Sequence, residues 1–206
     1  MSQQLPLVSR TRPRITDLPD GRIWLEPGFL PDPDELFATL RDEIPWRQDT
    51  LRMFGKVHPV PRLHQWMADP GLSYRWSGLT MAPVPWIPTV AQIRDQVSAR
   101  VGVDFNSVLA NLYRDGQDTV GWHADDEPEL GPTPTIASIS LGATRDFQLR
   151  HRSRKDLNTV TLALPPGSLL VMEPPTQAHW HHALPRRKRV GEPRINLTFR
   201  VVLARG

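Results

Sequence analysis

Two short stretches of the sequence carry side chains that could hold a metal ion together. The first is His123-Ala124-Asp125, and the second is the run His179-Trp180-His181-His182. In extended chain, residues two apart point the same way, so His123 and Asp125 can reach one ion. Two histidines and a carboxylate on one face of an ion form the ligand set of non-haem Fe(II) enzymes that activate oxygen. A His near an Asp is also a common surface pair, and three histidines compete for the third position, so this motif alone leaves the site open.

A later segment with alternating side chains favours the metal site. One face carries Ile195, Leu197, Phe199 and Val201, and the other carries Arg194, Asn196, Thr198 and Arg200. An edge strand with its polar face in water would give the same alternation, but Lys or Glu would serve equally well there. Arg instead matches a carboxylate through two parallel hydrogen bonds, which Lys cannot offer. The polar face therefore suits a dicarboxylate cosubstrate that chelates iron at one end, and hydrolytic zinc chemistry would leave it unexplained.

Composition limits the alternatives. The 206 residues include no cysteine, which excludes disulfides, thiolate zinc sites, iron–sulfur clusters and a cysteine nucleophile. The formal net charge of +3 supports a polyanionic partner only weakly. No apolar run approaches the roughly 20 residues of a membrane helix, and the first residues lack the apolar core of a secretory signal. We expect a soluble, cytoplasmic monomer that does not bind membranes.

Two helices precede the strand-rich half of the chain. Asp32-Pro33-Asp34-Glu35 is typical of a helix start, with an N-cap acid, Pro at the first position and Glu three residues after the cap. A second helix is predicted after Pro88 and closes at Gly102, since Val90, Ile93, Val97 and Val101 recur at helical spacing. Residues 46–88 are rich in Pro, Trp and Gly and predict hairpins and loops.

Short strands dominate the rest. A strand is expected at 22–25, and further candidates are 106–113, 135–141, 145–151, 158–164, 168–172, 178–183 and 194–202. Two helices followed by short strands indicate an α+β fold with a sandwich or barrel in the C-terminal half. We expect a flexible arm over residues 1–20 and a single domain over 21–206.

These motifs together resemble the AlkB family of Fe(II)/2-oxoglutarate dioxygenases, most closely the animal members that repair duplex DNA. The matching residues are Asn111-Leu112-Tyr113, His123-Ala124-Asp125, His182 and the pattern R-x-N-x-T-x-R over 194–200. The resemblance runs from about Trp46 to Val202. It implies a double-stranded β-helix, or jelly roll, over about 106–202, with flanking helices and nucleotide-recognition hairpins at about 46–88.

The resemblance also implies the cofactors and their ligands. Fe(II) would be held by His123, Asp125 and His182; the last stands in the family's register relative to Arg194. The cosubstrate 2-oxoglutarate would be bound by Asn111, Tyr113, Arg194, Asn196, Thr198 and Arg200. Together with O2, these groups would oxidise an N-linked methyl group on a base such as 1-methyladenine or 3-methylcytosine, and the hydroxymethyl product would release formaldehyde beside succinate and CO2.

The substrate side of the resemblance is aromatic and charged. Tyr74, Trp76 and Ser77 match the family's base pocket, where a flipped base would stack, although both rings could instead lie in the core. Phe54, before Gly55 and between basic residues, matches a hairpin that wedges an aromatic ring into the duplex; it too could be a core residue. We also assign Arg62 to substrate binding.

Charged residues complete the expected nucleic-acid surface. Asp126 and Glu127 could read a cationic methylated base, or form a solvated acidic loop. Two basic clusters, Arg150–Lys155 and Arg186–Arg189, could neutralise phosphates, with Arg187, Lys188 and Arg189 assigned to DNA, although basic runs are usually solvated faces. The expected partner is alkylated DNA, double-stranded and also single-stranded. The alternatives are a demethylase of RNA or another substrate on the same scaffold, and a binding module without activity.

Overall fold

The computed structural model describes residues 12–53, 56–76, 79–81 and 83–203. The strands are β1 (Arg14–Leu18), β2 (Gly21–Glu26), β3 (Thr50–Met53), β4 (Lys56–Pro59), β5 (Leu63–Ala68), β6 (Tyr74–Trp76), β7 (Leu79–Met81), β8 (Ser107–Tyr113), β9 (Val120–His123), β10 (Ile136–Gly142), β11 (Arg145–His151), β12 (Val160–Leu164), β13 (Ser168–Glu173), β14 (Trp180–Leu184) and β15 (Arg194–Arg200). The helices are α1 (Pro33–Glu43), α2 (Pro88–Val101) and α3 (Thr176–His179), with a 3-10 turn at Pro128–Leu130.

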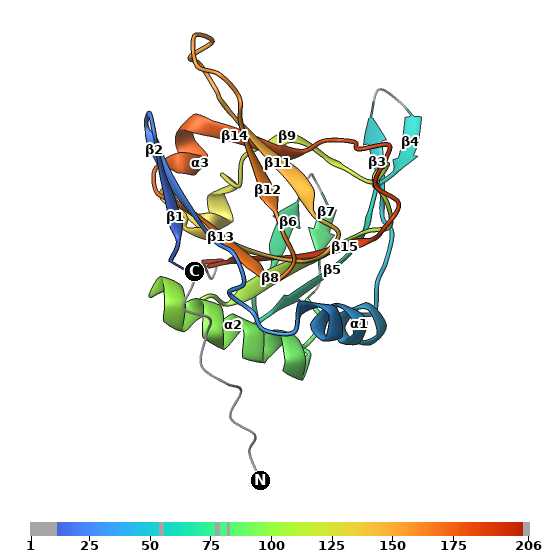
Figure 1. Ribbon diagram of the computed structural model, residues 1–206. Coiled ribbons are helices and arrows are strands. Elements are labelled where there is room, and N and C mark those ends of the chain that lie inside the picture. The colour runs from blue at the N-terminus through green and yellow to red at the C-terminus, as the bar shows by residue number, and fades with distance from the viewer. Residues whose placement is uncertain (1–11, 54–55, 77–78, 82, 204–206) are drawn as a thin grey trace.

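Two antiparallel sheets form the body of the molecule (Figure 1). The large sheet has the strand order β1-β2-β13-β10-β15-β8-β5, and the small sheet has the order β12-β11-β14-β9. From β8 onward the chain passes repeatedly from one sheet to the other, which is the winding of a double-stranded β-helix. The predicted jelly roll with flanking helices is therefore confirmed.

Helices α1 and α2 cover one face of the large sheet (Figure 1). On α2, Val90, Ile93 and Val97 are buried, as their helical spacing predicts. The helix ends at Gly102, which adopts a left-handed conformation with φ 76° and donates its backbone N–H to the carbonyl of Ser98. Within the described residues, no helix is long and apolar enough to cross a membrane.

Strand β15 lies in the interior of the large sheet, between β10 and β8, and all seven of its residues are buried. Its apolar residues Ile195, Leu197 and Phe199 pack into the core beneath the helices. Because side chains alternate along a strand, Arg194, Asn196, Thr198 and Arg200 face the space between the two sheets. The alternative of an edge strand with its polar face in water is therefore wrong.

A second apolar cluster lies between the two sheets. It joins Leu109 and Leu170 of the large sheet to Leu149 and Trp180 of the small sheet. Burial of this kind stabilises a protein by roughly 25 cal/mol for each Å² of apolar surface removed from water. The cluster holds the sheets together on one side of the polar residues of β15, so these residues occupy a fixed place in a packed interior.

Some expected elements differ in the structure. The predicted arm over residues 1–20 is wrong for Arg14–Leu18, which form β1 and pair with β2, while residues 1–11 lie outside the described residues. Asp32 occupies the N-cap position of α1, yet it has φ 49° and no side-chain capping bond, so the predicted capping box does not form. The strand expected at 178–183 begins at Trp180, because α3 occupies Thr176–His179. The hairpins expected in 46–88 are present as β3–β4 and β6–β7.

Candidate metal centre and cosubstrate pocket

The two candidate histidine ligands come from neighbouring strands of the small sheet. His123 on β9 pairs directly with His182 on β14, and their ring centroids are 4.2 Å apart. Asp125 follows the end of β9, and one ligand atom from each of the three residues lies within 4.8 Å of the others. Neither His179 nor His181 belongs to this group. His181 directly precedes His182 on β14, so its side chain points to the opposite face of the sheet.

Both imidazoles are suited to donate a lone pair. Nδ1 of His123 lies 2.8 Å from the carbonyl of Gly121, so this nitrogen carries the proton and Nε2 is left for a ligand. Burial, with smaller contributions from His123 and Arg200 that the charge of Asp125 partly offsets, lowers the pKa of His182 to about 3, so the ring is neutral at physiological pH. A metal ion requires this unprotonated form.

The carboxylate of Asp125 is buried and ionised. Burial opposes its ionisation, but Arg200 and the two histidines outweigh that effect and lower its pKa to about 2. Oδ1 accepts a 2.7 Å hydrogen bond from Nη2 of Arg200. Oδ2 has no hydrogen-bond partner among the described residues and lies 3.9 Å from Nε2 of His182. A buried carboxylate oxygen rarely lacks a partner, and this one beside two imidazoles fits a divalent cation.

A polar cavity adjoins the three candidate ligands. Its floor is the polar face of β15, which β10 and β8 flank in register: Asn196 lies opposite Ser140 on β10 and Asn111 on β8. The residues lining the cavity are Arg62, Leu109, Asn111, Tyr113, Val120, His123, Asp125, Ser138, Phe147, Met172, His182, Leu184, Arg194, Asn196, Thr198 and Arg200. All six residues predicted for the cosubstrate therefore lie in one cavity with all three predicted metal ligands.

The two arginines of β15 lie in different surroundings. Arg200 is paired with Asp125. The Cα atom of Arg194 lies six residues earlier on the same strand, roughly 20 Å from that of Arg200. Nη2 of Arg194 donates a 2.8 Å hydrogen bond to Oγ of Ser140, and its guanidinium lies 5.4 Å from the ring centroid of Tyr113. Burial lowers the pKa of Arg194 to about 10, so it stays charged, and its Nε has no hydrogen-bond partner in the described part of the chain.

The residues predicted for the substrate are spread more widely. Phe54 and Ser77 lie outside the described residues, and Tyr74 and Trp76 fall on β6, which pairs with β7. Arg62 is buried, and its Nε donates a 2.7 Å hydrogen bond to Oδ1 of Asn111, inside the cosubstrate cavity.

Several charged residues predicted for the substrate lie near the outside. Asp126 is exposed and accepts a 2.8 Å hydrogen bond from Nη1 of Arg152, while Glu127 is partly buried. Arg187 is held by Asp146 at 2.7 Å. Lys188 and Arg189 are exposed. The loop of residues 186–189, which follows β14 and is called the basic loop below, therefore carries exposed cationic side chains.

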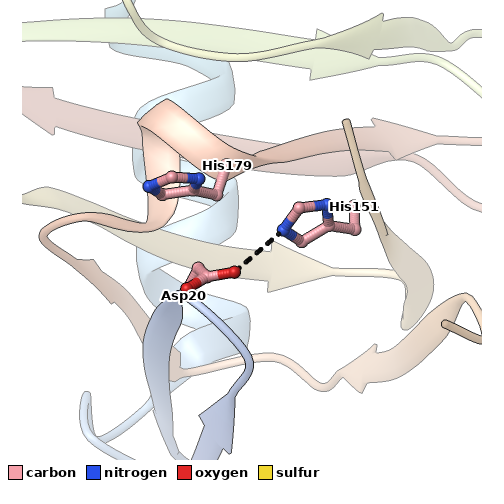
Figure 2. Close-up of side chains that lie close together, drawn as sticks. All are labelled: Asp20, His151 and His179. Atoms are coloured by element: carbon pink, nitrogen blue, oxygen red, sulfur yellow. Dashed lines mark ion pairs between the residues drawn. The ribbon is translucent and has the colours of Figure 1, made fainter. Parts of the chain in front are cut away.

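A second group of possible ligands consists of Asp20, His151 and His179 (Figure 2). Nε2 of His151 lies 3.5 Å from Oδ2 of Asp20. Nδ1 of His151, however, accepts the backbone N–H of Arg154 at 3.0 Å and that of Ser153 at 3.3 Å. The proton of a neutral His151 is therefore on Nε2, which then has no lone pair for a metal. This group links the β1–β2 turn to the end of β11 and does not repeat the first site.

Sequence reasoning missed several residues around the site. Ser138 and Ser140 bond Asn196 and Arg194, and Gln177 bonds the backbone of Asp125. Small hydroxyl and amide side chains are common, and nothing in their local sequence distinguishes them. The pairing of β10 with β15 brings the two serines beside that strand, and α3 brings Gln177 to the backbone of Asp125.

Fold and site together define an oxygenase that uses iron and 2-oxoglutarate. A family model described as the 2OG-Fe(II) oxygenase superfamily matches residues 24–200. The chain belongs to this superfamily and, within it, to the AlkB family, as its sequence predicts. Fe(II), 2-oxoglutarate and O2 are therefore its cofactors.

Named relatives support this placement. The chain is 48% identical over 179 residues to the mouse protein named DNA oxidative demethylase ALKBH2, which covers 82% of this chain and 75% of that protein. It is 42% identical over 192 residues to the bovine alpha-ketoglutarate-dependent dioxygenase alkB homolog 3, with 88% and 66% covered. It spans 64% to 75% of the mammalian ALKBH2 proteins that it matches. The solved structure of OsALKBH1 shares the fold, with a TM-score of 0.60 at 18% identity over 91% of this chain and all of that one.

Proposed function

We propose that this protein is an oxidative demethylase of alkylated DNA that acts on N-methylated bases such as 1-methyladenine and 3-methylcytosine. The observation that carries the proposal is the single cavity in which His123, Asp125 and His182 adjoin the polar face of β15. The oxidative demethylase name of the mouse relative, at 48% identity, supports DNA as the substrate.

The metal assignment follows from the ligand chemistry. His123 and His182 would each supply Nε2, and Asp125 would supply Oδ2, the oxygen that has no hydrogen-bond partner among the described residues. When bound, the iron activates O2 for insertion of one oxygen atom into a C–H bond and for oxidative decarboxylation of 2-oxoglutarate. Arg200 fixes the other oxygen of Asp125 and so orients the carboxylate.

The cosubstrate would lie along β15. Arg194 would bind the distal carboxylate, because its charge is buried with a hydroxyl as its hydrogen-bond acceptor. Tyr113, Asn111, Asn196 and Thr198 would line the rest, and Arg200 would stand near the metal end. A charged guanidinium and a carboxylate make hydrogen bonds about twice as strong as neutral ones.

The proposed reaction would consume one O2 and one 2-oxoglutarate for each methyl group removed. One oxygen atom of O2 enters the N-methyl group as a hydroxymethyl, and the other enters succinate as 2-oxoglutarate loses CO2. The hydroxymethyl then releases formaldehyde: the electron pair of its C–N bond returns to the base nitrogen, and its hydroxyl proton is lost to water, so that the cationic base becomes neutral. The protein's part is to hold the base and the cosubstrate and to keep the buried cavity dry.

Aromatic and charged side chains would recognise the substrate. Tyr74 and Trp76 would stack on the flipped base, with Ser77 and Arg62 beside it, and Phe54 would fill the gap in the duplex. Asp126 or Glu127 would read the positive charge of the methylated base. Arg187, Lys188 and Arg189 would contact phosphates, which makes binding sensitive to salt.

The test is formaldehyde release from matched single- and double-stranded DNA and RNA that carry 1-methyladenine or 3-methylcytosine, with Fe(II) and 2-oxoglutarate present. We expect turnover on DNA by a monomer, with duplex as a substrate, and we expect none from Asp125→Ala. Release from RNA alone would point to an RNA demethylase. Succinate formation without formaldehyde from any of these substrates would contradict action on N-methylated bases.

A further inference from the structure

A buried glutamine behind the metal centre bonds the backbone of one candidate ligand. Gln177 on α3 is 2% exposed, and its Oε1 accepts the backbone N–H of Asp125 at 2.9 Å. We propose that Gln177 is a positioning residue that sets the orientation of Asp125 and thereby the affinity and geometry of the metal site. This inference rests on the proposed role of Asp125 as a metal ligand.

The orientation of the glutamine amide is determined by its two partners. Nε2 donates to Sδ of Met172 at 3.3 Å, while Oε1 faces the N–H of Asp125. A flipped amide would place its NH2 group against that N–H, two donors facing each other, so only one orientation is satisfied. Gln177 is therefore fixed at both polar atoms of its side chain.

The short helix that carries Gln177 is itself anchored. Oγ of Thr176 accepts the N–H of Arg22 and donates to the carbonyl of the same residue, both at 3.0 Å. Nε1 of Trp180 donates to the carbonyl of Pro19 at 2.8 Å. Figure 2 shows His179, at the end of this helix, close to Asp20 of the β1–β2 turn and to His151 at the end of β11. The β1–β2 hairpin thus holds α3 in place.

The side chain of Arg152 links α3 to the segment that follows β9. Nη1 of Arg152 lies 2.8 Å from Oδ2 of Asp126, and it also reaches the carbonyls of Gln177 at 3.4 Å and Ala178 at 3.3 Å. The segment that follows β9 is thus joined to α3 through the N–H of Asp125 and through the side chain of Asp126.

These hydrogen bonds leave one carboxylate oxygen of Asp125 available to a metal ion. Gln177 fixes the backbone N–H of Asp125, and Arg200 fixes Oδ1, so the remaining oxygen, Oδ2, is directed toward His182. Groups that orient a metal ligand without touching the metal typically change metal affinity about 10- to 100-fold when they are replaced. Gln177 has the geometry of such a group, acting through the main chain.

The test compares two buried glutamines. Gln177→Met keeps the side-chain length and removes the acceptor. Gln65→Met is the matched control: Oε1 of Gln65 also accepts a backbone N–H, from Trp66, and its Nε2 also donates, to the carbonyl of Pro45, but neither partner is a candidate metal ligand. Each metal-free protein is titrated with Co2+ alone, and the absorption spectrum of the bound ion is recorded, since the spectrum reports ligand geometry.

We expect Gln177→Met to bind Co2+ about 10- to 100-fold more weakly than wild type and with an altered spectrum, whereas Gln65→Met loses stability but keeps both. Gln177→Glu restores an acceptor and should return the wild-type spectrum. If Gln177→Met does not fold, Gln177→Asn, whose shorter amide retracts from the Asp125 N–H, should show the same weakening.

An unchanged affinity and spectrum in Gln177→Met, or in Gln177→Asn if that variant has to be used, would overturn the positioning role. A wild-type protein that binds no Co2+, or one whose binding survives Asp125→Ala, would instead overturn the metal assignment on which the inference rests. The two failures are therefore distinguishable by the wild-type titration and the Asp125→Ala control.

Discussion

Replacing Arg194 tests whether β15 anchors 2-oxoglutarate. Arg194 is 2% exposed, and its pKa falls from 12.5 to about 10, mainly because of burial. That depression corresponds to roughly 3 kcal/mol of bias against the charged guanidinium. A carboxylate that pairs with Arg194 and removes this bias gains about the same free energy. Arg194→Ala should therefore weaken 2-oxoglutarate binding on the order of a hundredfold.

The assay is a 2-oxoglutarate titration of the Mn2+-loaded protein by calorimetry, together with the KM for 2-oxoglutarate in turnover. Arg145→Lys is the control. The guanidinium of Arg145 also lies near the ring of Tyr113, 5.9 Å from its centroid. Unlike Arg194, it donates hydrogen bonds to three backbone carbonyls, those of Asp115, Asp118 and Pro185. This variant keeps the charge and should lose stability without losing affinity. A 2-oxoglutarate affinity in Arg194→Ala within about threefold of wild type would refute the anchor, since the expected loss is roughly 3 kcal/mol.

Further predictions concern the ligands, the wedge and the basic loop. Asp125→Ala should abolish succinate formation while leaving DNA binding in a gel-shift assay; retained turnover would remove the metal assignment. With metal chelated, the unfolding free energy should fall by about 2 kcal/mol from pH 7 to pH 5, because unfolded His182 takes up a proton near its ordinary pKa of 6.5 while burial holds the folded pKa at about 3. Urea titrations should show this loss reduced in His182→Phe, and an equal loss in that variant would assign the dependence to other groups. Phe54→Ala should slow repair of duplex DNA more than of single strands, and equal slowing would argue against a wedge. Gly116→Ala would place a Cβ 1.9 Å from the carbonyl oxygen of Arg187, so the basic loop must shift; binding of DNA should then weaken and its salt dependence decrease, with the KM for 2-oxoglutarate unchanged.

Much of the fold was predictable because it depends on local periodicity. The apolar spacing of α2 and its glycine end predicted the helix correctly. The alternation of residues 194–200 predicted a strand with one apolar face and one polar face. It could not predict that the strand is central, since that depends on pairing with β8 and β10.

The contacts that complete the site were not predictable from the sequence. Arg200 meets Asp125 across 75 positions of sequence, and Gln177 meets it across 52. The N-terminal residues 14–18 have a polar, Pro-flanked sequence, yet they form β1 because β2 offers a free edge. Asp32 likewise departs from its expected capping role. For residues 14–18, pairing with β2 prevailed over local preference.

The placement of His123 and His182 on adjacent strands has a consequence for the lifetime of the protein. An ion bound by both residues and by Asp125 would cross-link segments that are far apart in the chain, and it would bind the folded state in preference to the unfolded state. Such a ligand at a hundredfold excess over its dissociation constant stabilises the folded state by about 2.7 kcal/mol. A cell short of iron would then hold this protein in a less stable form that unfolds and is degraded more readily. Iron supply would thus govern the amount of the enzyme as well as its turnover.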